Sequence, residues 1–79
     1  MIIKTEAELN VARTFCNEPF YYFSVSEIAE KAGISRTWVY KVIKKFKKFN
    51  MLIEEKKSYR FDFSNFLCKK LKLFSIQNS

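Results

Sequence analysis

Hydrophobic residues recur at helical spacing in the first part of the chain. Apolar side chains three or four positions apart line one face of an α-helix. The first such set comprises Leu9, Ala12, Phe15 and Cys16. Thr5 and Glu8 stand at capping-box spacing just before this set, and Pro19 follows it. We therefore expect a helix over about residues 6–17.

A shorter helix and a longer one are predicted next, with a tight turn between them. Ser24 and Glu27 have the spacing of a second capping box, which opens the shorter helix. Gly33, the only glycine in the chain, ends that helix because a left-handed backbone is cheapest for glycine. Ser35 is a good N-cap for the longer helix. Two helices joined in this way make a helix-turn-helix, here over about residues 24–49.

Strand-like patterns flank this motif on both sides. Residues 20–23, Phe-Tyr-Tyr-Phe, are short and aromatic, and we interpret them as a brief strand with core side chains rather than as a base-stacking platform. Asn50 suits a left-handed helix end. After it, residues 51–55 and 58–63 are predicted as two strands joined by a tight turn, and hydrophobic and polar residues alternate in the second of them. We place this hairpin at about residues 51–63.

A last helix is predicted near the C-terminus, over about residues 64–75. Phe66 or Leu67, together with Leu71 and Phe74, would form its apolar face. This face could pack on the first helix or on a second copy of the chain, so a homodimer through this helix stays open beside a monomer. Together the elements predict a single α+β domain, mostly helical, over residues 1–79.

The composition leaves little room for catalytic or metal chemistry. The chain has no histidine and one glycine, and its two cysteines, Cys16 and Cys68, stand far apart without a CxxC motif. We therefore expect no enzyme, no metal and no cofactor. The cysteines leave a disulfide open but favour two buried or half-buried thiols in a reducing cytoplasm. No apolar run approaches the ~20 residues of a membrane span, so we expect a soluble cytoplasmic protein without a membrane partner.

Charge is distributed unevenly along the chain, whose net charge is +7. Residues 1–35 hold three basic and five acidic residues, whereas residues 36–79 hold twelve basic and three acidic ones. Such asymmetry predicts a polyanionic partner for the C-terminal half. The third predicted helix, residues 36–49, is the strongest part of this signal, since it carries six basic residues and no acid. Like charges three or four positions apart repel by ~0.2–0.5 kcal/mol per pair, which a negatively charged partner would offset.

The order of these elements resembles the winged helix-turn-helix family of DNA-binding transcription regulators, of archaeal, bacterial or viral and plasmid type. The family pattern has a small residue in the first helix of the motif, glycine in the turn and apolar residues at fixed later points. These positions hold Ala29, Gly33, Ile34, Val39 and Val42. The resemblance spans about residues 5–63 and is closest within residues 25–44. It implies three helices, a short two- or three-stranded β-wing and a C-terminal helix.

The resemblance also implies that the third helix enters the major groove of double-stranded DNA. The expected DNA-contacting residues are Ser35, Arg36, Thr37, Tyr40, Lys41, Lys44 and Lys48 on this helix, and Lys56, Lys57 and Arg60 on the wing. Arg36 is expected to read guanine, whose two acceptors match a guanidinium. Thr37 and Tyr40 are assigned to thymine methyls or phosphates, and the lysines of the helix to phosphates.

The apolar side of the third helix carries the remaining structural prediction. At 100° per residue, its members are Val39, Val42, Ile43, Phe46 and Phe49. Trp38 lies at the edge of this arc, and we interpret it as a partly buried core residue. Contact with the wing, with a second subunit or with the DNA backbone is the alternative for Trp38.

The predicted function is sequence-specific binding of double-stranded DNA by a transcription regulator. A non-specific nucleic-acid-binding or nucleoid protein would show the same charge pattern, so it stays open. A winged helix used as a protein-interaction module is a third reading. It would favour an apolar or mixed surface on the third helix, which differs from the basic surface expected here.

Overall fold

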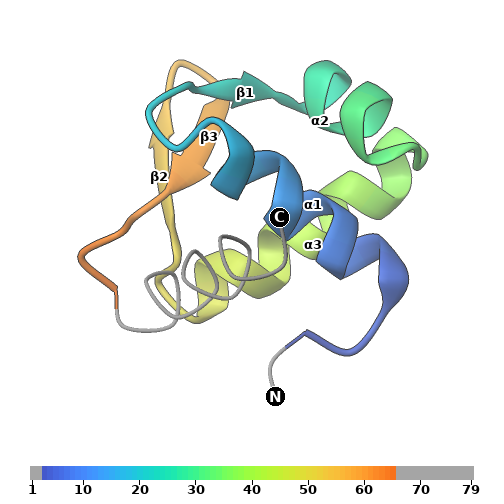
Figure 1. Cartoon of the computed structure of the whole chain (residues 1–79), viewed down its shortest axis with the longest axis horizontal. Helices are drawn as coiled ribbons and strands as arrows, with labels where there is room; N and C mark the ends of the chain where they lie inside the picture. The colour runs from blue at the N-terminus through green and yellow to red at the C-terminus, as the bar shows by residue number, and fades with distance from the viewer. Residues whose placement is uncertain (1–2, 66–79) are drawn as a thin grey trace.

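The computed structural model of the chain describes residues 3–65. These residues form three helices and a three-stranded antiparallel sheet with the strand order β1-β3-β2 (Figure 1). In chain order the elements are α1 (Glu6–Asn17), β1 (Phe23–Ser24), α2 (Val25–Ala32), α3 (Arg36–Lys48), β2 (Leu52–Glu55) and β3 (Ser58–Phe61). The fold is the predicted winged helix-turn-helix, in which α2 and α3 are the motif and the β2–β3 hairpin is the wing. The predicted C-terminal helix, and a dimer formed through it, lie outside the described residues.

The helix-turn-helix forms where its capping residues stand. Ser24 Oγ accepts a hydrogen bond from the backbone N–H of Glu27 (3.2 Å), and the Glu27 carboxylate accepts one from the N–H of Ser24 (2.9 Å). Gly33 follows α2 in the left-handed region, with a φ of 69°. Ser35 Oγ then accepts a hydrogen bond from the N–H of Trp38 (3.3 Å) and caps α3. These predictions are confirmed, and the end of α3 falls within one residue of the expected end.

Helix α1 has the predicted bounds, and Ala12 and Phe15 of its predicted apolar face are buried. Its buried residues are Glu8, Val11, Ala12, Thr14 and Phe15, whereas Leu9 and Cys16 are only half-buried. Positions 8, 11, 12 and 15 have the ideal spacing for one helical face. The apolar residues Val11, Ala12 and Phe15 indicate this face, but they do not show that it also includes Glu8, a glutamate that pairs with Lys45 of α3.

The capping box expected at the start of α1 forms only in half. Thr5 Oγ accepts a hydrogen bond from the N–H of Glu8 (3.1 Å), so the threonine caps the helix as predicted. The Glu8 carboxylate does not return to the N–H of Thr5. It accepts hydrogen bonds from the Thr5 hydroxyl (3.0 Å) and from the backbone N–H of Lys4 (3.3 Å), because its other oxygen is held by Lys45.

The wing closes through a two-residue turn. Lys56 and Lys57 occupy this turn with φ of 50° and 63°, so both central residues are left-handed, as a type I′ turn requires. Glu55 and Ser58 are paired directly beside it. Asn50, at the other end of the wing, has the predicted left-handed backbone, with a φ of 56°. The two predicted strands are confirmed, although each is shorter than expected.

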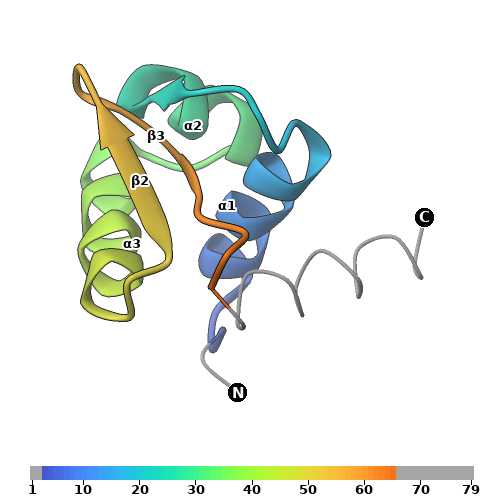
Figure 2. The ribbon, with the colours of Figure 1, turned by 90° about the vertical axis from the view of Figure 1, so that its left-hand side faces the viewer.

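The core lies between the sheet and the helices (Figures 1 and 2). Its largest fully buried side chains are Phe15, Phe23, Phe46, Phe61, Ile28, Met51, Val11 and Val39. Of the aromatic stretch at residues 20–23, only Phe23 joins the core, so the interpretation of the whole stretch as strand and core is wrong. The N–H of Tyr21 bonds to the carbonyl of Glu18 (3.2 Å), and this turn leaves Phe20 80% exposed.

Candidate nucleic-acid interface

The outer face of α3 is set by the face that it buries. Val39, Val42, Ile43 and Phe46 are buried against the rest of the domain. At 100° per residue, the opposite side of the helix carries Thr37, Lys41, Lys44 and Lys48, all exposed, and we call these four residues the ridge. Figure 2 shows α3 along one side of the molecule, with the wing beside it. The ridge is therefore presented to solvent next to the wing.

All seven residues predicted to contact DNA from α3 and its cap are exposed. They are Ser35, Arg36, Thr37, Tyr40, Lys41, Lys44 and Lys48. They do not form one line, because Arg36 lies about 100° around the helix from Thr37. Arg36 stands at the first position of α3, where a side chain can extend past the helix end. Phe49, which was expected on the apolar arc, is 42% exposed because it caps the helix where the chain turns away.

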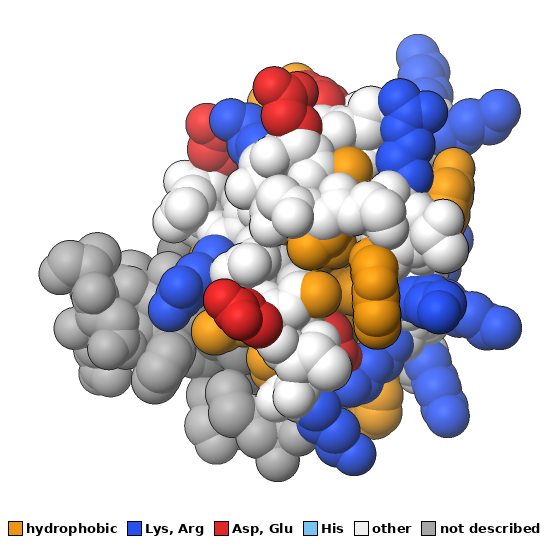
Figure 3. Space-filling view, turned by 90° about the vertical axis from the view of Figure 1, so that its right-hand side faces the viewer, with side chains coloured by type: hydrophobic (Ala, Val, Ile, Leu, Met, Phe, Trp, Pro, Cys, Tyr) orange, Lys and Arg blue, Asp and Glu red, His pale blue; other side chains and the backbone are white. Residues whose placement is uncertain are grey.

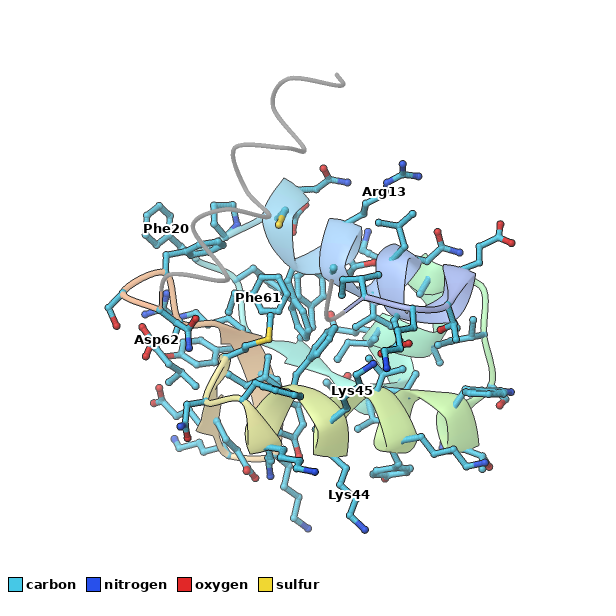
Figure 4. All side chains as sticks on the ribbon, turned by 90° about the horizontal axis from the view of Figure 1, so that it is seen from below. Arg13, Phe20, Lys44, Lys45, Phe61 and Asp62 are labelled. Carbon is cyan, nitrogen blue, oxygen red and sulfur yellow. The ribbon has the colours of Figure 1, made fainter. Side chains whose placement is uncertain are left out.

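Two lysines of α3 have acidic partners on other elements. Lys45 pairs with Glu8 of α1, and Lys47 Nζ lies 2.6 Å from the carboxylate of Glu54 on β2. Figure 4 shows Lys45 directed toward α1 and Lys44 directed away from the body of the domain. The hydrogen bond to Glu54 raises the pKa of Lys47, so this lysine stays charged. The sequence shows six basic residues without an acid on α3, but it cannot show that two of them meet acids from elsewhere.

The remaining basic residues of α3 are available to a ligand. Among the described residues, no acidic side chain forms an ion pair with Arg36, Lys41, Lys44 or Lys48. Helical angles separate only part of these two groups: Lys45 and Lys47 lie on opposite flanks of the ridge, but Arg36 lies within about 20° of Lys47. Figure 3 shows Lys and Arg side chains gathered along the edge of the molecule formed by α3, away from most of the acidic side chains on that face. This edge is the most basic part of the described surface in that view.

Trp38 does not join the core. Its side chain is 48% exposed, and the Lys41 ammonium lies 5.0 Å from its ring centroid, within the range of a cation–π contact. The two residues border a hollow of about 180 Å³ between α3 and the start of α1, which Thr5 and Lys45 also line. The interpretation of Trp38 as a partly buried core residue is therefore wrong. Its side chain lies beside the N-terminal end of α1, at the hollow, rather than against the sheet.

The structure brings two of the three predicted wing residues together. Lys56 and Lys57 are exposed side by side in the turn at the tip of the wing. Arg60 lies back from the tip on β3, the central strand, where its guanidinium stands 5.2 Å from the ring centroid of Tyr22. Because Tyr59 on the same strand faces the core, Arg60 points to the outer face of the sheet. Arg60 therefore belongs to a different surface from the two lysines of the turn.

Within residues 3–65, no group of three His, Cys, Asp or Glu side chains could hold a metal ion. In the same part of the chain, no helix is long and apolar enough to cross a membrane.

The fold, with its wing and the exposed basic second helix of its motif, is that of a winged helix-turn-helix protein. Residues 3–76 match the model of the UPF0122 family, described as "Putative helix-turn-helix protein, YlxM / p13 like", and the chain belongs to this family. No curated protein and no solved structure matches the chain. The family assignment confirms the helix-turn-helix in the resemblance drawn from the sequence.

Proposed function

We propose that this protein binds double-stranded DNA in a sequence-specific way and acts as a transcription regulator. The observation that carries the proposal is the ridge of α3, which offers Thr37 and three lysines with no acidic partner among the described residues. An α-helix fits the major groove of B-form DNA, which carries a distinct hydrogen-bonding pattern for each base pair. In a helix-turn-helix, the N-terminal residues of the second helix approach the base edges while the first helix crosses the backbone.

The roles proposed for the residues of α3 follow from their places along the helix. Arg36 and Thr37 stand in its first turn, nearest to the base edges in such a docking. A guanidinium can donate to both acceptors of guanine, so Arg36 is the proposed base-reading residue. Tyr40 is 60% exposed and can contact a thymine methyl or a phosphate. Lys41, Lys44 and Lys48 follow at positions suited to phosphates, where they give affinity without sequence preference.

The turn of the wing gives independent support. A left-handed backbone costs an ordinary residue roughly 1–2 kcal/mol, and type I′ turns therefore favour Asn-Gly. Here two lysines with positive φ occupy both central positions. A sequence chosen for the stability of the hairpin alone would differ. Two adjacent cations at the exposed tip are better explained by contact with a DNA backbone or groove, which we propose for Lys56 and Lys57.

A non-specific nucleic-acid-binding or nucleoid protein is the second candidate. It is favoured by one observation, namely that three of the four ridge residues are lysines, which suit phosphates of any sequence. The third candidate, a protein-interaction module, is supported by the exposed aromatic side chains of Trp38 and Tyr40 but not by the ridge, which is basic. The first two candidates differ in the specificity ratio that they predict, not in affinity alone.

The proposal is tested by selection from a random duplex pool at near-physiological salt. Fluorescence anisotropy then compares the enriched duplex, a random duplex and RNA. A specific regulator should enrich a short motif and prefer it at least ~10³-fold over random duplex. Equal, salt-sensitive binding to every duplex and to RNA would establish the non-specific alternative. The Arg13→Ala variant is the control for the loss of a positive charge outside the interface, and it should bind the enriched duplex as the unaltered protein does. Figure 4 places Arg13 on α1, on the far side of the domain from Lys44.

A further inference from the structure

We infer that Lys47 is a positioning residue that fixes the wing against α3 and so sets the spacing between the two DNA-contacting parts of the molecule. The inference rests on the proposed function. Lys47 itself is not assigned to DNA. Its role is to hold the tip of the wing at one distance and angle from the ridge, so that both reach the same duplex together.

The geometry places one ammonium group against both strands of the wing. Lys47 Nζ lies 2.6 Å from Glu54 Oε1 on β2 and 5.2 Å from the ring centroid of Tyr59 on β3. Glu54 and Tyr59 are direct cross-strand partners. A single side chain from the last turn of α3 therefore contacts both members of one cross-strand pair, Glu54 and Tyr59, which we call the rung. It forms an ion pair with one strand and a cation–π contact with the other.

The position of this rung explains why the contact controls the angle of the wing. The base of the wing is already fixed, because the N–H of Met51 bonds to the carbonyl of Phe46 (3.0 Å) and the N–H of Asp62 to the carbonyl of Met51 (2.7 Å). The rung held by Lys47 is next to the pair that flanks the turn. β1 pairs with β3 at Tyr59 and Ser58, so β3 is already held up to the turn, whereas β2 is the edge strand of the sheet. The ion pair between Lys47 and Glu54 ties this edge strand to α3 one residue pair away from the turn, and it therefore restrains the tip of the wing through β2.

The charge balance separates Lys47 from the lysines of the ridge. Its charge is neutralised by Glu54, and both side chains are about half exposed, at 47% and 43%. A lysine that binds phosphate releases counterions, which changes the salt dependence of binding by about one unit of slope. A lysine already paired with a carboxylate should contribute little to that slope. Lys48, its neighbour on the ridge, provides the matched comparison because it has no ion-pair partner among the described residues.

The test compares Lys47→Met with Lys48→Met in the full chain. Residual dipolar couplings of the free protein report the orientation of the wing relative to α3, and anisotropy at several salt concentrations reports binding to the enriched duplex. We expect Lys47→Met to disturb the orientation of the wing and to weaken binding about two- to fivefold, as expected from losing an exposed ion pair, with the salt slope unchanged. We expect Lys48→Met to leave the orientation unchanged and to reduce the salt slope by about one unit.

A charge-reversal pair supplies the rescue. Glu54→Gln alone should disturb the wing as Lys47→Met does, whereas Lys47→Glu combined with Glu54→Lys restores the ion pair, but not the contact from position 47 to the Tyr59 ring, and should recover most of the orientation and of the binding. An unchanged orientation in Lys47→Met, or a fall in its salt slope equal to that of Lys48→Met, would overturn the inference. Failure of the unaltered protein to bind any duplex would overturn the proposed function, and the role of Lys47 on DNA with it. If instead the unaltered protein binds DNA and the Lys47 and Glu54 variants bind it equally well, the inference about Lys47 fails and the proposed function stands.

Discussion

Lys45 of α3 forms an ion pair with Glu8 of α1, and Glu8 is only 6% exposed. The same carboxylate accepts hydrogen bonds from the Thr5 hydroxyl and from the backbone N–H of Lys4. The pair therefore joins the proposed recognition helix to the start of α1. Since a carboxylate at this depth has lost most of its hydration, its partners decide whether the arrangement is stable.

We predict that Lys45→Met destabilises the domain, because it leaves the Glu8 carboxylate buried without its cation. The expected loss is about 1–3 kcal/mol in the free energy of unfolding. The double variant Lys45→Met with Glu8→Leu should recover much of this loss, since an apolar pair can replace a buried ion pair. Urea unfolding measures both. Lys44→Met is the control, expected within about 0.5 kcal/mol of the unaltered protein. Equal effects of Lys44→Met and Lys45→Met would contradict the role given to the pair.

The same pair predicts a loss of stability in acid. Burial raises the pKa of Glu8, but hydrogen bonds from Lys45 and Thr5, the charge of Lys45 and the N–H of Lys4 outweigh it and leave the pKa below its ordinary value of 4.5. The unfolded chain thus binds this proton more readily than the folded one. The contribution of Glu8 to the free energy of unfolding is complete above pH 4.5. It is lost as the pH falls from 4.5 through the lower pKa of Glu8 in the folded protein.

Urea midpoints measured between about pH 7 and about pH 3 test this dependence. Glu8→Gln should make the urea midpoint depend less steeply on pH, without removing the dependence altogether. The slope that remains comes from two half-buried residues, Glu27 and Asp62, whose carboxylate pKa is also lowered. Glu27 accepts a hydrogen bond from the backbone of Ser24, and Asp62 accepts from the side chain of Ser64. A curve for Glu8→Gln that is as steep as that of the unaltered protein would show that Glu8 carries none of the effect.

Local signals explain why most of the fold was predictable. The capping box at Ser24, the glycine at position 33 and the serine at position 35 each act on their own few residues, so the sequence shows where α2 and α3 begin and end. The alternation around Tyr59 similarly shows which side of β3 is buried. These features need no knowledge of distant partners.

The candidate site was predictable only where exposure follows from the helical period. That period places Thr37 and Lys44 on the outer side of α3. It cannot show that Lys45 and Lys47 are paired with Glu8 and Glu54, because those acids are distant in sequence. Whether a charged residue lies in solvent or in a pair is decided by tertiary packing, and this information is not contained in local spacing.

The turn of the wing predicts an exchange between stability and binding. Replacing Lys56 and Lys57 with Asn and Gly should stabilise the domain by about 1–2 kcal/mol, because these residues accept positive φ at lower cost. The same change should weaken binding to every duplex and reduce the salt slope by up to about two units. Thermal unfolding and anisotropy measure the two effects. The control is a double variant with the same loss of charge away from the wing, Lys4→Gln with Arg13→Gln, which should leave the affinity for DNA nearly unchanged. A stable variant with undiminished binding would remove the wing from the interface.

Gly33 allows a test of backbone conformation without a change in packing. A Cβ added to Gly33 would meet no atom within 4 Å, so only its φ of 69° resists substitution. Gly33→Ala should therefore lower the free energy of unfolding by about 1–2 kcal/mol. D-alanine at this position, introduced by chemical ligation, favours positive φ and should match or exceed the stability of the unaltered protein. Equal losses with both alanine enantiomers would mean that space, rather than φ, limits this position.

The last prediction separates base reading from phosphate binding on α3. Arg36→Ala should weaken binding to the enriched duplex by about 1–3 kcal/mol and relax preference at one base pair. Lys44→Ala should weaken binding to all duplexes alike and reduce the salt slope by about one unit. Anisotropy on the enriched duplex and on its single-base variants distinguishes the two effects. If Arg36→Ala weakened every duplex equally, Arg36 would be a phosphate contact. Base reading would then pass to Thr37 and Tyr40, the other exposed polar side chains near the start of α3.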